Sequence, residues 1–115
     1  MKMHDWLLIP KEQLNPLIAR QVIHSGNMTV AKIFLKKGAT VPLHVHENEQ
    51  ITILVEGSLK FHYPDREQIV EAGQILETAP NIPHSVDALE DSIAIDLFAP
   101  RREDWIRGDD AYLRK

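Results

Sequence analysis

The chain has 115 residues, the length of one domain, and its 43% hydrophobic and 26% charged residues are typical of a folded globular protein. Its 13 Lys and Arg against 17 Asp and Glu give a formal charge of −4, which argues against nucleic acid as a partner. The absence of cysteine excludes disulfides and thiol chemistry. No apolar run approaches the ~20 residues that span a bilayer, and the first ten residues lack the apolar core of a signal peptide. We therefore expect a cytoplasmic protein with no membrane partner.

Short extended segments separated by turns dominate most of the chain. They are rich in β-branched and apolar residues, and turns recur about every 8–12 residues, which is typical of an all-β sandwich or barrel. At Gly57-Ser58 the pattern predicts a hairpin between two of these segments. The expected strands lie at 29–35, 50–56, 59–63, 68–70, 75–78 and 92–98.

We expect one domain over residues 1–115, divided into three parts. Residues 1–28 are an N-terminal extension, 29–98 form the antiparallel barrel, and 99–115 form a C-terminal tail. Only 102–107, after Pro100, has a helical pattern. The fold class is therefore all-β with a short helical turn near the C-terminus.

Two expected strands each have one aliphatic and one mixed face, because side chains alternate along a strand. The mixed faces are expected to line a cavity, since a polar-lined barrel interior is a place for a ligand. The aliphatic faces are expected to pack sheet on sheet or against a second subunit, and we predict a homodimer. The aliphatic faces carry Ile51, Ile53, Val55, Ile93, Ile95 and Leu97, and the mixed faces carry Gln50, Thr52, Leu54, Glu56, Ala94, Asp96 and Phe98.

A group of histidines is the clearest candidate for chemistry. His44 and His46 share a strand face, roughly 6–7 Å apart at their Cα atoms, so their rings can converge on one cation. Gln50 has the same parity, and prolines stiffen the approach to His84. Three imidazoles and an amide oxygen would suit a divalent metal with open positions. The alternative is that these are ordinary surface or turn histidines, as we expect for His4, His24 and His62.

The spacing of these residues resembles the two motifs of the cupin superfamily. Gly38, His44-Val45-His46, Gln50 and Gly57 match the first motif, with Gln in place of the usual Glu. Gly73, Ala79-Pro80-Asn81 and His84 match the second, with Asn81 replacing a glycine. Asn tolerates the left-handed conformation that this turn needs. Ala88 stands where the family usually has Asn.

The cupin resemblance implies an antiparallel double-stranded β-helix, or jelly roll, that binds one divalent metal. Its ligands would be His44, His46, Gln50 and His84, and the ion would be zinc, nickel, manganese or iron. The neutral amide leaves the full metal charge available to polarise a substrate oxygen.

Within the superfamily the chain resembles small cupins of the KdgF type. The stretch Asn48-Glu49-Gln50 and the tail residues Asp96, Phe98 and Arg102-Glu103-Asp104 carry this resemblance. It implies an enzyme of pectin and alginate breakdown, an isomerase or lyase that opens the ring of 4,5-unsaturated monouronates to a linear keto form. Its partner would be a small sugar acid.

That chemistry needs a group that transfers protons, a clamp for the substrate carboxylate and a wall for the sugar. A carboxylate in an apolar strand is costly unless it is paired or functional, so Asp96 is the candidate general acid/base. Arg102 would hold the substrate carboxylate as a bidentate fork, Phe98 would wall the sugar, and Lys32 would be a second anion contact. The structural alternatives are a salt-bridged Asp96, a solvated Arg102, a core Phe98 and a Lys32 at the rim.

The fold alone does not decide the function. Another cupin enzyme, such as a dioxygenase or a sugar isomerase, and a non-enzymatic binder of sugars or small anions remain open. A cupin without any bound ligand is a further alternative.

Overall fold

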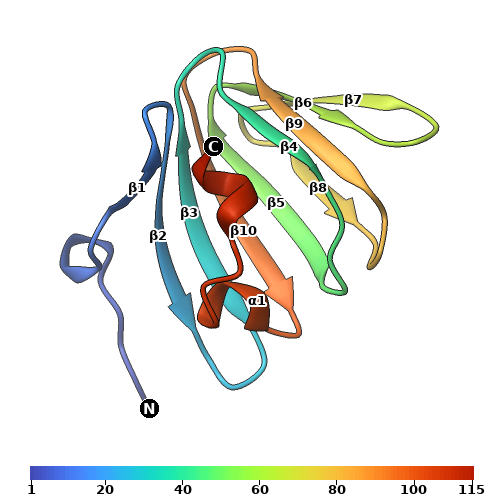
Figure 1. The fold of residues 1–115 in the computed structure, drawn as a ribbon. Helices are drawn as coiled ribbons and strands as arrows, with labels where there is room; N and C mark the ends of the chain where they lie inside the picture. Colours follow the sequence, from blue (N-terminus) through green and yellow to red (C-terminus); the bar gives the residue numbers. More distant parts are fainter.

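The computed structural model describes residues 1–115 as two antiparallel sheets that face each other (Figure 1). One sheet has six strands in the order β1-β2-β3-β10-β5-β8, and the other has four in the order β4-β9-β6-β7. The expected all-β jelly roll is confirmed. The strands are β1 (Glu12–Asn15), β2 (Ile18–His24), β3 (Thr29–Leu35), β4 (Thr40–His44), β5 (Glu49–Glu56), β6 (Ser58–His62), β7 (Glu67–Glu71), β8 (Ile75–Thr78), β9 (His84–Ala88) and β10 (Ser92–Ala99).

The chain passes from one sheet to the other at Gly57. The expected hairpin there is wrong, because β5 belongs to the six-stranded sheet and β6 to the four-stranded one. Gly57 has φ 92°, and a Cβ at this position would lie 2.2 Å from Ser92 Oγ. Only glycine therefore fits this crossing.

Residues 1–28 contribute directly to the barrel. Strands β1 and β2 come from this segment, and β2 pairs with β3 from Ile18↔Leu35 to His24↔Thr29. The expected division at residue 29 therefore falls inside the six-stranded sheet. Arg20 and Gln21 are both buried and interrupt the apolar pattern of β2, so the hydrophobic pattern of the sequence does not indicate this strand.

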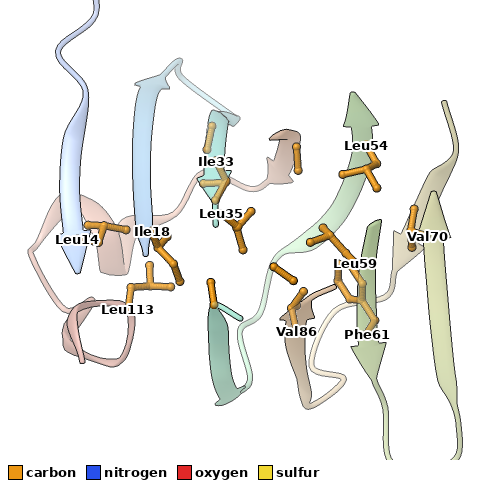
Figure 2. Packing of buried hydrophobic residues seen from close by; sticks show 14 of the residues in the cluster. Leu14, Ile18, Ile33, Leu35, Leu54, Leu59, Phe61, Val70, Val86 and Leu113 are labelled. Atoms are coloured by element: carbon orange, nitrogen blue, oxygen red, sulfur yellow. The ribbon is translucent and has the colours of Figure 1, made fainter. Parts of the chain in front are cut away.

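The mixed faces of β5 and β10 point inward, as predicted. Gln50, Thr52, Leu54, Ala94 and Phe98 are all buried between the sheets. Leu54, Ala94 and Phe98 belong to the core, in which Leu54 faces Leu59, Phe61 and Val86 of the other sheet (Figure 2). Glu56, at the end of β5, is exposed instead. The aliphatic faces lie on the outer surface of the six-stranded sheet and are only partly covered.

The C-terminal segment closes one side of the barrel. It contains helix α1 (Glu103–Ile106) and the 3-10 turn η2 (Ala111–Arg114), in the region where a helical turn was predicted. Turn η2 contacts β1 and β4, the edge strands of the two sheets. Figure 1 shows this segment lying across the strands, with the C-terminus near the middle of the molecule.

A second 3-10 turn, η1 (Trp6–Leu8), lies near the N-terminus. None of the helices has the length and the apolar character that crossing a membrane requires.

Candidate metal centre and cavity

Three histidines converge inside the barrel. His44 ends β4 and lies opposite His84, the first residue of β9, in the pairing of these two strands. His46 follows in the loop after β4. One ring nitrogen from each of the three lies within 4.8 Å of those of the other two. The turn that leads to His84 contains Asn81 at φ 62°, which confirms that Asn can fill the position where the family usually has Gly.

The backbone fixes which nitrogen of each ring faces the centre. Nδ1 of His44 lies 2.8 Å from Pro42 O, and Nδ1 of His84 lies 2.8 Å from Ile82 O. Nδ1 of His46 lies 3.1 Å from Asn48 O. A carbonyl can only accept, so Nδ1 of His44 and of His84 carries the hydrogen and their Nε2 atoms keep the lone pair. His46 can donate from Nδ1 to Asn48 in the same way, but its Nε2 also lies 3.1 Å from an acceptor, Gln50 Oε1, and a neutral ring has one hydrogen for the two.

Burial also keeps these rings neutral. It lowers the pKa of His44 and of His46 to about 4, and it lowers the pKa of His84. Neutral imidazoles with their lone pairs turned to a common point could bind a metal ion.

Gln50 adds a fourth donor atom beside these rings. Its Oε1 lies 3.1 Å from His46 Nε2, while its Nε2 donates to Thr52 Oγ1 at 3.0 Å. Thr52 in turn donates to Asp96 Oδ1 at 2.7 Å. An ionised carboxylate only accepts, so this chain of donors fixes the amide with its oxygen toward His46. When His46 donates from Nδ1 to Asn48, its Nε2 and Gln50 Oε1 are two lone-pair atoms that face each other in a buried place, and a bound cation would satisfy both. The donor set therefore fits a divalent metal.

Asp96 lies in the middle of β10, opposite Thr52 of β5, and lines the same cavity as His44 and His84. Burial raises the pKa of its carboxyl to about 6, although hydrogen bonds from Thr52 and Gln50 act in the opposite direction. Gln50 Nε2 is 3.4 Å from Asp96 Oδ1. The carboxyl group is thus linked by hydrogen bonds to the histidine cluster and has no basic side chain bonded to it.

Arg102 also lines the cavity, but its bidentate fork is already occupied. Nε and Nη2 donate to the two carboxylate oxygens of Asp104, at 3.0 and 2.8 Å. The guanidinium lies between two aromatic rings, 4.7 Å from the centroid of Phe98 and 4.4 Å from that of Trp105. The fork predicted to grip a substrate carboxylate thus holds Asp104 in this structure, and the role of Arg102 toward a substrate stays a prediction. Only Nη1 has no hydrogen bond to the protein.

Phe98 lies both in the core and at the cavity, the two places that the sequence analysis considers for it. It is buried in the core, and its ring meets the ring of His46 edge to face at 5.6 Å, so it also forms a wall of the cavity.

Lys32 does not reach the cavity. Its Nζ lies over the rings of Phe34 and Trp6, 5.4 and 5.7 Å from their centroids, on the outer surface of the six-stranded sheet. The interior face of β3 carries Ala31 and Ile33. Strand parity grouped Lys32 with Phe34 correctly, but parity alone does not tell which of the two faces is the inner one.

Two tail residues that the sequence did not indicate also border the cavity. Tyr112 stacks on His44 with 4.8 Å between ring centroids, and its hydroxyl accepts a hydrogen bond from Arg102 Nη2 at 2.8 Å. Trp105 packs against Phe98. Neither lies in a strand pattern or at a metal-ligand spacing, so the sequence held no signal for them beyond their aromatic character.

Asn48 joins the histidine loop to this tail. It is buried, and its Nδ2 donates to the carbonyl oxygens of Pro100 and Arg101. The stretch that resembles KdgF-type proteins thus includes a residue that positions both His46 and the C-terminal segment.

The jelly roll and its inward-facing histidines define a class of small barrels with an internal cavity that could hold a metal ion. A family model for the cupin domain matches residues 32–98, and the chain belongs to the cupin family.

Among curated proteins the chain is similar to the pectin degradation protein KdgF of Dickeya dadantii. The two are 30% identical over 100 residues, which cover 84% of this chain and 91% of that protein. The solved structure of KdgF from Halomonas sp. is 28% identical with a TM-score of 0.77, covering 84% of this chain and 92% of that one. An RmlC-like cupin from Shewanella frigidimarina has the same fold, with a TM-score of 0.84, 24% identity and coverage of 91% and 96%.

Proposed function

We propose that this cupin is a metal-dependent enzyme that opens the ring of 4,5-unsaturated monouronates, an isomerase or lyase acting on a sugar acid. The observation that carries the proposal is one cavity lined by His44, His84, Gln50, Asp96 and Arg102. The similarity to KdgF proteins over most of the chain supports it.

The proposed metal ligands are the Nε2 atoms of the three histidines and Oε1 of Gln50. This set has no charge, and the cavity leaves room for ligands from a substrate. Zinc, nickel, manganese and iron all accept imidazole nitrogen. When bound, the ion supplies positive charge that polarises a substrate oxygen.

The proposed reaction moves protons and changes no overall composition. The hydroxyl on C1 loses its proton, a C1 carbonyl forms, and the bond from C1 to the ring oxygen breaks. The ring oxygen keeps the electron pair of that bond and forms an enolate with the C4–C5 double bond, and one proton added to C4 converts the enolate to a ketone. We assign these proton transfers to Asp96, because it borders the metal ligands and is not bonded to a cationic side chain.

A spectroscopic assay tests this function. The protein is loaded with a divalent metal and given 4,5-unsaturated galacturonate, and loss of the ultraviolet absorbance of the conjugated double bond is followed. We expect loss faster than the uncatalysed background and suppression by a chelator. No acceleration by protein with confirmed bound metal would contradict the proposal, and ligand-induced stabilisation without product would point to a binding protein.

We also propose that the protein is a homodimer. The outer face of the six-stranded sheet places Ile53 beside Ile95 and Ile75, and Ile51 beside Leu97. Ile75 is 65% exposed, and the others are only partly buried. A second copy seated on this face would cover a continuous aliphatic surface.

A further inference from the structure

The C-terminal turn brings one hydroxyl group into the cavity. Tyr112 lies on η2, which fills the gap between the edge strands β1 and β4. Its ring is nearly parallel to that of His44, with 24° between the planes, and it lines the same cavity as Asp96. The side chain therefore lies beside the histidine cluster and lines the cavity with it.

The hydrogen on this hydroxyl has no acceptor in the protein. Tyr112 Oη lies 2.8 Å from Arg102 Nη2 and 3.4 Å from Trp105 Nε1. Guanidinium and indole nitrogens can only donate, so the phenol oxygen accepts both bonds. Its own O–H is left to point elsewhere. An unused donor that borders a cavity is a group for a ligand.

The turn that carries Tyr112 is firmly anchored. Asp110, which is 2% exposed, pairs with Arg20 and Arg114. Leu113 is buried in the core, and Asn15 Nδ2 donates to its carbonyl oxygen at 3.0 Å. The hydroxyl is thus held in place before any ligand arrives, which lowers the entropy lost on binding.

A second free donor lies on the neighbouring side chain. Asp104 and Tyr112 use Nε and Nη2 of Arg102, but Nη1 makes no hydrogen bond to the protein. A cationic N–H and a neutral O–H that share one side of a largely apolar cavity favour an anionic oxygen over a neutral one.

We propose that Tyr112 is a substrate-binding residue whose hydroxyl donates, together with Arg102 Nη1, to the carboxylate of a sugar acid. The inference rests on the proposed function and adds to it the group that recognises the acid. Asp104 already accepts from two nitrogens of Arg102, so the bidentate clamp is not free. The proposal assigns one donor from Arg102 and one from Tyr112 in its place.

The test compares Tyr112→Phe with the wild-type protein on unsaturated galacturonate and on its methyl ester. The variant keeps the ring and removes the hydroxyl. We expect KM for the acid to rise by about tenfold or more, since the lost bond is to a charged group. KM for the ester should change little, and metal content should not change. Tyr63→Phe is the matched control, because the Tyr63 hydroxyl already pairs with Thr78 at 2.6 Å and does not line this cavity.

A further measurement does not depend on turnover. In an Asp96→Asn background, calorimetry should show the same tenfold weaker binding of the acid when Tyr112→Phe is added.

The outcomes separate the two proposals. Equal effects on acid and ester, or no effect on either, in a protein that opens the ring would overturn the role of Tyr112 and leave the function standing. A metal-loaded wild-type protein that does not act on the unsaturated uronate would overturn the function and, with it, the substrate assigned to Tyr112.

Discussion

Oε1 of Gln50 lies 3.1 Å from Nε2 of His46, and neither atom carries a hydrogen in the tautomer in which His46 donates from Nδ1 to Asn48. The amide is oriented by Thr52, and the imidazole by the carbonyl of Asn48. Two buried acceptors at this distance are unfavourable unless a cation lies between them or beside both. The pair therefore forms one part of the proposed metal site, and the fold would build it before an ion binds.

Removing a histidine should remove the metal. We expect His84→Ala to weaken metal affinity by more than the ~10–100-fold that loss of a group orienting a ligand costs. Metal content after dialysis, measured by mass spectrometry, checks this. His62→Ala is the control, because His62 pairs with Asp87 and Glu67 on the outer surface. Equal metal content in the two variants would count against the site.

Much of this site could be predicted from the sequence because its members occur at short, regular spacings. The pattern of alternation placed Asp96, Phe98 and Gln50 on one face, and the structure puts all three at the cavity. Alternation does not show which of the two faces is the inner one. The sequence therefore suggests the cavity for Lys32, although its face is the outer one. That choice depends on the opposite sheet, which packs against Ala31 and Ile33 rather than Lys32.

Contacts between residues far apart in the chain also could not be predicted from the sequence. The crossing of the chain at Gly57 depends on Ser92, 35 positions later, which leaves no space for a side chain. Tyr112 reaches His44 only because η2 bridges two edge strands. Neither relationship has a local pattern, so single-sequence periodicity could not reveal it.

Asp96 should be needed for turnover and not for metal binding. We expect Asp96→Asn to lower kcat by about 10²–10⁴-fold, the range of a positioned acid or base, with metal content unchanged. The amide has nearly the same shape and can still accept from Thr52. Steady-state rates with unsaturated galacturonate check this, and Asp87→Asn on the outer face is the control. Near-normal turnover by the Asp96 variant would remove the residue from the mechanism.

Arg102 should also stabilise the fold. It is 1% exposed, stacks on Phe98 and Trp105, and bonds Asp104 through two nitrogens. Lysine can reproduce neither the fork nor the stack. We expect Arg102→Lys to lower the free energy of unfolding by about 2 kcal/mol, measured in urea.

The matched control for this change is Arg107→Lys. Arg107 pairs with Asp109, and both side chains are largely exposed, so its replacement should change stability by less than ~0.5 kcal/mol. Similar losses in the two variants would show that burial of Arg102 contributes nothing.

Asp110, which pairs with Arg20 and Arg114 and anchors the C-terminal turn, should make the free energy of unfolding depend on pH in the acid range. Burial alone would raise the pKa of Asp110, but hydrogen bonds from Arg114 and Arg20 outweigh it and lower the pKa below its ordinary 3.8. A carboxylate with a lowered folded-state pKa stabilises above its unfolded pKa and loses that contribution as pH falls through the folded value. Urea unfolding should therefore show a loss of stability below about pH 4.

Asp110→Asn should remove this contribution at neutral pH as well. Arg20 would keep its buried charge with the half-exposed Glu12 as its only carboxylate partner, and we expect a loss of about 2 kcal/mol. The variant should also show a shallower decline of stability between pH 5 and pH 2 than the wild type, by roughly the contribution of one carboxylate. The neighbouring Asp109→Asn is the control because Asp109 is exposed. An unchanged acid profile in the Asp110 variant would contradict this account.

The proposed dimer predicts a change of mass when its centre is disrupted. Ile53 lies between Ile95 and Ile75 on the outer face of the six-stranded sheet, so a lysine there would place a charge in the interface. We expect light scattering to give a dimer for the wild type and a monomer for Ile53→Lys. Ile69→Lys is the matched control, since Ile69 is 45% exposed on β7 of the other sheet and should leave the dimer intact. A wild-type protein that is a monomer at high concentration would rule out the dimer, and dissociation by Ile69→Lys alone would move the interface to the four-stranded sheet.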